Sequence, residues 1–276
     1  MPYRDHVEKG GMYMRRLLGP VMLVVLLGLF CASAHATLWT FTGSNGSNLS
    51  AQAVFNQISN TTLEVTLTNL GAAAAVNADI FTAVFFDILN GPTAVTAGMN
   101  PLSGALAAGS VVVNGSFNPL YPELGDYWVY GGPGGGQGPA PGNAIVKTLT
   151  GSPPGGASRG ISAVGLGIFD GTNLGPRPAP PKQPDGGDWG LVNGIANGGP
   201  RDRPLASNAA VFDLALRTGT WNPAWTIGKV SFQYGSTTGD PNLAGGQESA
   251  VPEPASCALL ALAMCGVGGA LKRRKK

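Results

Sequence analysis

Apolar and polar side chains alternate along the middle of the chain. Between Thr62 and Thr68 every second residue is apolar, which is the period of a strand with one buried face. Residues 80–89, IFTAVFFDIL, are apolar on both faces except at Thr82 and Asp87, and this pattern predicts a central strand. No stretch keeps the period of an amphipathic helix.

Two further strand patterns lie near the end of this region. Residues 211–216 and 227–234 both alternate, and we expect them to pair with each other. The chain holds 43 Gly and 22 Pro, so turns are frequent and helix-rich folds are disfavoured. The sequence therefore predicts an all-β domain over residues 37–244, an antiparallel sandwich or a jelly-roll-like fold.

The N-terminal segment is typical of a secretory signal peptide. Arg15 and Arg16 precede the 14-residue apolar run 17–30, a length within the usual range of a signal core. Ala34 and Ala36 place small side chains at the two positions that signal peptidase accommodates, so we expect cleavage before Thr37. The alternative is an uncleaved anchor helix, but the run is shorter than the roughly 20 residues that span a bilayer.

The C-terminal segment combines three chemically distinct pieces. Residues 245–254 form a linker that ends in Val251-Pro-Glu-Pro254, and residues 255–271 form a 17-residue apolar run. The two prolines keep the linker extended. A helix over the run is about 25 Å long, which is workable for one transmembrane helix with flanking bases. Five bases then act as a cytoplasmic stop-transfer signal: Lys272, Arg273, Arg274, Lys275 and Lys276.

The order of these pieces resembles the PEP-CTERM sorting signal of bacterial surface proteins. The resemblance covers residues 251–276 and implies that Pro252, Glu253 and Pro254 form the motif recognised by an exosortase, a membrane-embedded cysteine protease. It also implies export, an intermediate held in the inner membrane, and release to the surface of bacteria that make exopolysaccharide. The alternative is a plain tail anchor that happens to follow a proline pair.

The distribution of charge and of His and Cys excludes several functions for the middle region. Residues 37–250 carry eight bases against twelve acids, 8 − 12 = −4, so no basic patch for nucleic acid is expected. His6, His35 and all three cysteines lie outside this range. Triads that need imidazole, and zinc, copper or haem sites, are therefore excluded there. We expect no cofactor and no metal site.

Carboxylate pairs are the remaining catalytic option, because glycoside hydrolysis needs only two acids. The candidates are Glu123 with Asp126, Asp185 with Asp188, and Asp170. Each lies beside Gly, Pro or Asn, where acidic side chains commonly stabilise turns, and we favour that structural role. For Trp189, after a proline-rich loop, we favour anchoring in the core over stacking on a sugar.

We therefore expect an exported, non-enzymatic structural or adhesive protein that associates with exopolysaccharide. Its expected partners are the Sec machinery, signal peptidase, an exosortase-type protease and the membrane. The expected order is a signal peptide (1–36), the β domain, the linker, a transmembrane helix (255–271) and a basic tail (272–276). Two alternatives stay open, a glycan-binding module and a carboxylate-dependent carbohydrate-active enzyme.

Overall fold

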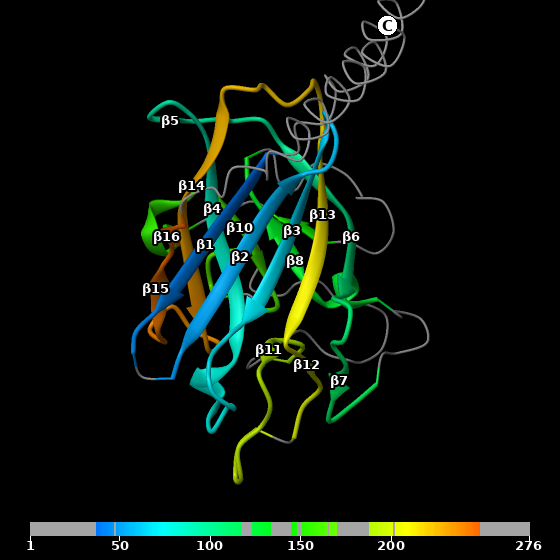
Figure 1. Cartoon of the computed structure of the whole chain (residues 1–276), viewed down its shortest axis with the longest axis vertical. Coiled ribbons are helices and arrows are strands. Elements are labelled where there is room, and N and C mark those ends of the chain that lie inside the picture. The colour runs from blue at the N-terminus through cyan, green and yellow to red at the C-terminus, as the bar shows by residue number, and fades with distance from the viewer. Residues whose placement is uncertain are drawn as a thin grey trace, which may run out of the picture. The chain divides into compact units, whose positions relative to one another are not determined.

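The computed structural model describes residues 37–46, 48–116, 123–133, 145–147, 149, 151–164, 166–169, 188–200 and 202–248. These residues form sixteen strands, three short 3-10 helices (Asn77–Asp79, Leu124–Tyr127 and Pro154–Gly156) and no α-helix. The all-β prediction is confirmed, and the two sheets are compatible with a sandwich (Figure 1). The predicted signal peptide and transmembrane helix lie outside the described residues.

The first sheet has six strands, all antiparallel, in the order β16-β1-β2-β3-β13-β6. Its strands are β1 (Leu38–Ser44), β2 (Ser50–Gln57), β3 (Thr62–Asn69), β6 (Met99–Leu106), β13 (Ala209–Leu216) and β16 (Gly246–Gln247). The alternation predicted in β3 is confirmed, because its apolar residues are buried and Thr62, Glu64, Thr66 and Thr68 face outward, half-buried. One face of this sheet is thus polar and one is apolar.

The second sheet is built around β4 (Phe81–Asn90), which is the predicted central strand. The sheet order is β7-β12-β11-β4-β10-β8-β9, and β5 and β14 also pair with β4, while β15 pairs with β14. The bounds are β5 (Thr93–Ala94), β7 (Val112–Val113), β8 (Val129–Gly131), β9 (Ile145–Lys147), β10 (Arg159–Ser162), β11 (Leu191–Val192), β12 (Leu205–Ser207), β14 (Trp225–Tyr234) and β15 (Asn242–Ala244). The pairs β11–β12 and β8–β9 are parallel, so this sheet is mixed.

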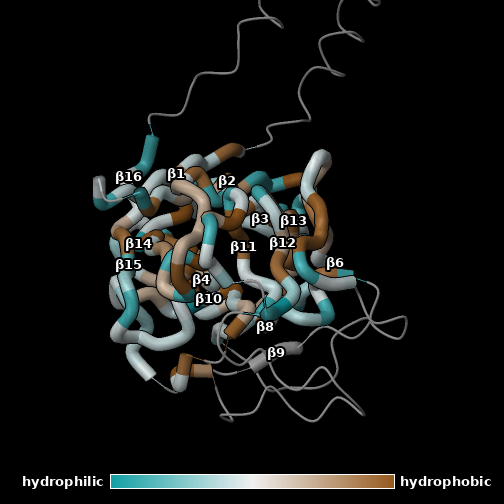
Figure 2. The backbone as a smooth tube through the Cα atoms, turned by 90° about the horizontal axis from the view of Figure 1, so that it is seen from below, coloured by the Kyte–Doolittle hydropathy of each residue, from teal (hydrophilic) through white to brown (hydrophobic). Residues whose placement is uncertain are grey.

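Both faces of β4 are buried, which explains its continuous apolar sequence. Val84, Phe86 and Ile88 contribute to the main apolar core, to which strands of both sheets supply residues. Figure 2 colours the backbone by hydropathy and shows hydrophobic stretches in both sheets. Ala83 and Phe85 belong to a second apolar cluster, which residues 157–169 supply on the other face. Asp87 lies at the end of that second face and is also fully buried.

The predicted pairing of residues 211–216 with 227–234 is wrong. β13 pairs with β3 and β6 in the first sheet, whereas β14 pairs with β4 and β15 in the second. The connection between them crosses the sandwich, and its Trp221 packs between Trp39 and Trp225. Both strands have one apolar face that packs on the core, and this pattern does not determine in which of the two sheets each strand lies.

The C-terminal part of the domain also crosses from one sheet to the other. β15 extends the second sheet, and after Gly245 the chain joins the first sheet as β16 beside β1. A Cβ atom at Gly245 would lie 3.0 Å from the carbonyl oxygen of Val230, so the crossing passes close to β14. The amide of Glu248 then donates to the carbonyl of Thr40 at 2.9 Å. The described chain therefore ends beside the strand with which it begins.

Candidate functional site

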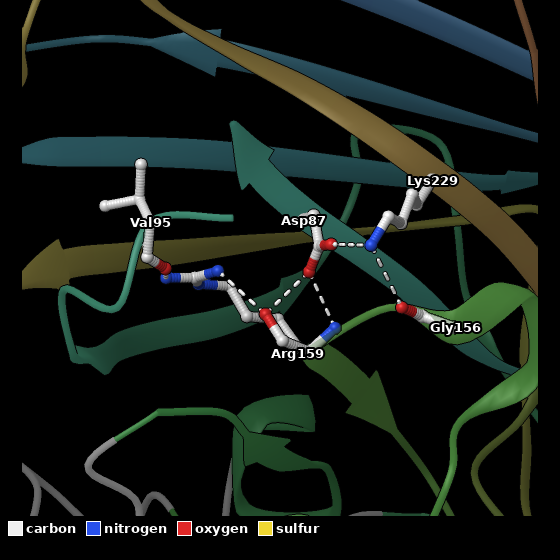
Figure 3. Close-up of polar contacts among 6 residues, drawn as sticks. Asp87, Val95, Gly156, Arg159 and Lys229 are labelled. Atoms are coloured by element: carbon white, nitrogen blue, oxygen red, sulfur yellow. Dashed lines mark hydrogen bonds and ion pairs between the residues drawn. The ribbon is translucent and has the colours of Figure 1, made fainter. Parts of the chain in front are cut away.

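A buried carboxylate, Asp87, is the centre of a polar cluster that joins three strands of the second sheet (Figure 3). β4 places it on the outer face of the second sheet, and its exposed fraction is 0%. Its Oδ1 accepts hydrogen bonds from the amide and the hydroxyl of Ser158, both at 2.6 Å. A buried carboxylate needs such partners, because an unpaired charge in an apolar environment is very costly.

Lys229 supplies the opposite charge from a β-bulge. Gly228 pairs with Asp87 and Ser231 pairs with Phe85, so two residues of β14 face one residue of β4. Lys229 has a left-handed backbone with φ of 48°, which costs a residue with a side chain about 1–2 kcal/mol. The bulge allows its Nζ to lie 3.0 Å from Asp87 Oδ2 and 3.3 Å from the carbonyl of Gly156. The ion pair thus stabilises the strained bulge.

The environment keeps Asp87 ionised. Burial alone raises the pKa of this carboxyl, but the hydrogen bonds from Ser158 and the ammonium of Lys229 outweigh burial and hold the pKa below its ordinary value of 3.8. Asp87 is therefore no general acid at neutral pH. The Ser158 hydroxyl is engaged as well, because it donates to Asp87 and accepts from Arg159 Nη1 at 3.1 Å.

Arg159 extends the cluster into the core between the sheets. It is fully buried on β10 opposite Phe86, and its Nη2 donates to the carbonyls of Val95 and Ala97 at 2.6 and 2.9 Å. Burial raises the pKa of nearby Tyr130, and the guanidinium of Arg159 partly offsets this rise. Arg159 therefore ties the segment between β5 and β6 to the central sheet.

The arrangement is suited to holding strands together. Ser158 connects Asp87 on β4 with Arg159 on β10. Lys229 extends this network to β14 and to the 3-10 helix Pro154–Gly156, and Arg159 extends it to the segment after β5. The carboxylate of Asp87 binds Ser158 and Lys229. The guanidinium of Arg159 donates mainly to backbone carbonyls. We infer a structural role for this cluster.

The low pKa of Asp87 predicts how stability depends on pH. A folded-state pKa below the unfolded value of about 3.9 contributes stability that is fully present above pH 5 and is lost as pH falls through the folded pKa. We expect guanidinium unfolding curves to show that Asp87→Asn is less stable than the wild type, with a gap that is constant above pH 5 and shrinks below pH 4. A gap that stays constant or widens toward pH 3 would contradict this assignment.

The predicted processing residues lie almost entirely outside the described residues. These are Ala34, Ala36, Pro252, Glu253, Pro254 and the five bases 272–276. Thr37 is described, and it is exposed at the start of the domain, where its carbonyl accepts the amide of Gln57 at 3.1 Å. Cleavage before Thr37 stays a prediction.

The first carboxylate pair has the structural role that we favoured. Glu123 precedes the 3-10 helix Leu124–Tyr127 and Asp126 is its third residue, and the amide of Glu123 donates to Asp126 Oδ2 at 3.3 Å. Both acids line a cavity of about 40 Å³ beside Trp128 and Phe212. That volume holds a few water molecules, whereas small-molecule sites need about 300 Å³ or more. A sugar ring does not fit between these two acids.

The other sequence candidates are placed as follows. Asp188 forms an ion pair with Arg203 at 3.7 Å, and Asp170 and Asp185 lie outside the described residues. Trp189 is buried and stacks on Tyr127 with ring centroids 4.2 Å apart, and its carbonyl accepts the indole N–H of Trp128. Its anchoring role is confirmed, and a sugar-stacking role is not compatible with this burial.

No three His, Cys, Asp or Glu side chains in the described part of the chain are grouped so that they could hold a metal ion. The same part contains no helix that is long and apolar enough to cross a membrane.

The sequence interpretation missed the cluster around Asp87. The available signal was a charged residue within the apolar run 80–89, because a charge in a central strand requires partners. Its partners Ser158 and Lys229 are far away in the sequence, and only the pairing of β4 with β10 and β14 brings them together.

Comparison with known proteins identified no similar protein. The chain matches no family model, no curated protein and no solved structure.

Proposed function

We propose that this chain is an exported surface or extracellular-matrix protein whose C-terminal signal directs sorting and processing. The observation that carries the proposal is the order of the pieces in residues 251–276: a Pro-Glu-Pro motif, an apolar run and five terminal bases. This order provides an extended segment for a protease, a membrane helix and a stop-transfer signal.

The β domain acts in this proposal as a structural or adhesive module without catalysis. Three of its described acids support this role, since Asp87, Asp126 and Asp188 are engaged in ion pairs or turns. The outer face of the first sheet offers a second support. Short hydroxyl and amide side chains dominate it, and they suit hydrogen bonds to the hydroxyl groups of an exopolysaccharide: Thr40, Thr42, Gln52, Asn56, Thr66 and Thr68.

A polysaccharide screen of residues 37–250 tests the module. Binding and the release of reducing ends are measured on the same set of polymers. Binding without release supports the adhesive role. Release would support the carbohydrate-active enzyme, and binding neither polymer nor oligosaccharide would favour a purely structural protein.

The mature N-terminus tests the export half of the proposal. We expect mass spectrometry to find Thr37 as the first residue of the surface-located protein. Replacing both Ala34 and Ala36 with Asp should block cleavage, because charges would enter the apolar pockets of signal peptidase. Ala32→Asp is the matched control and should be cleaved normally. Recovery of peptides from the run 17–30 in the mature protein would refute this prediction.

A further inference from the structure

Both ends of the described chain point to the same end of the sandwich, here called the exit end. The exit end consists of Thr37–Leu38, Ile58–Thr61, Asn90–Ala94 and Arg217–Trp225. β1 starts there, and β16 runs antiparallel to β1 until Glu248 reaches the level of Thr40. In Figure 1 this end carries β5 and the connection from β13 to β14, whereas β7, β11 and β12 lie toward the opposite, far end.

The two ends differ in charge. The residues of the exit end include no Asp or Glu and a single base, Arg217. The described loops of the far end carry four carboxylates and the base Arg203: Asp79, Asp188, Asp202 and Asp240. An anionic lipid surface therefore repels the far end and does not repel the exit end.

The exit end also holds Trp225, which is half-buried, whereas Trp39, Trp128, Trp189 and Trp221 are buried. Trp221 lies with its ring centroid 5.9 Å from that of Trp39 and 5.5 Å from that of Trp225. Leu38 and Ile58 beside them are 51% and 49% exposed. Tryptophan is enriched where proteins meet the headgroup region of a membrane. Single exposed apolar residues occur at the far end too, so charge and the partly exposed Trp225 distinguish the two ends.

The length of the linker limits how far this end can lie from a membrane. Only residues 249–254 separate Glu248 from the apolar run 255–271, and six extended residues span at most about 20 Å. The headgroup layer itself occupies roughly 5–8 Å of that distance. We propose that the exit end rests on the lipid headgroups while the tail is attached, with Leu38, Ile58 and Trp225 entering the interface. This inference depends on the proposed role of residues 255–271 as a membrane anchor.

The full chain, reconstituted in phosphatidylethanolamine–phosphatidylglycerol vesicles, provides the test. Cys31, Cys257 and Cys265 are replaced by alanine, and a single cysteine carries an environment-sensitive fluorophore. Asn60→Cys reports on the exit end, and Asn197→Cys is the matched far-end position; both residues are exposed. Lipids with a spin label near the headgroup should quench the fluorophore at residue 60 several-fold more strongly than the one at residue 197.

Two controls separate the possible failures. Leu38→Asp in the Asn60→Cys protein should reduce the quenching, whereas Leu70→Asp at the far end should not. Equal quenching at residues 60 and 197, or stronger quenching at 197, would overturn the proposed orientation while leaving the anchor intact. A chain that does not co-float with the vesicles would refute the anchor and, with it, the contact.

Discussion

Arg159→Ala is expected to destabilise the domain by about 3–5 kcal/mol. The substitution leaves a cavity beside β10 and removes the donors of the buried carbonyls of Val95 and Ala97. It also removes the positive group beside Ser158, which holds Asp87. For a domain of this size the loss corresponds to a fall in the melting temperature of about 10 °C or more. Calorimetry or guanidinium unfolding of residues 37–250 measures it.

Two variants show whether the hydrogen bonds cause this loss. Arg159→Met keeps most of the side-chain volume. The stability that this variant still loses is therefore due to the unpaired carbonyls and to the missing hydrogen bond to Ser158. Arg203→Ala removes a guanidinium from partly exposed ion pairs with Asp188 and Asp202, and it should cost about 1 kcal/mol or less. If Arg159→Ala were no more destabilising than Arg203→Ala, the cluster would not hold the sheets together.

Local periodicity predicted four of the longer strands, β3, β4, β13 and β14, but not how β13 and β14 pair. β3 was predicted because every second side chain is apolar, and the structure buries only that face. β4 was predicted because nearly every side chain is apolar, and the structure buries both of its faces. β13 and β14 show the same one-sided alternation, which is compatible with either sheet. Their assignment depends on a connection whose tryptophans pack against Trp39, and this is a tertiary contact.

The polar cluster depends even more on tertiary structure. Lys229 reaches Asp87 only because a bulge interrupts the pairing of β14 with β4, and its left-handed backbone has no signature in a Gly-Lys-Val sequence. Glu123 and Asp126 were easier to interpret, since their spacing of three residues suits a short turn in which one acid caps the other's backbone. The turn role of Glu123 and Asp126 was therefore predictable because the two acids are close in sequence. The pairing of Asp87 with Lys229 was not, because these residues are far apart in sequence.

The C-terminal motif is expected to control whether the protein leaves the inner membrane. Under the sorting proposal, replacing Pro252, Glu253 and Pro254 with alanine would allow the predicted helix over residues 255–271 to extend outward, and it would remove the element that a protease would recognise. We expect the variant to stay full-length in the inner membrane, as measured by the mass of the C-terminal peptide and by cell fractionation. Glu248→Ala, an acid removed a few residues upstream, is the matched control and should be processed normally.

The basic tail should have a different effect from the motif. In the proposed topology, Arg15 and Arg16 would keep the front of the signal segment in the cytoplasm, and the bases 272–276 would keep the end of the proposed membrane helix there, so that the motif would face the outside. Neutralising the five bases should weaken the stop and release some unprocessed, unanchored protein. The motif variant should instead accumulate in the membrane, because its stop-transfer signal is intact. If the triple-alanine variant lost its tail and reached the surface at the normal rate, residues 255–271 would be a simple anchor and the sorting proposal would be wrong.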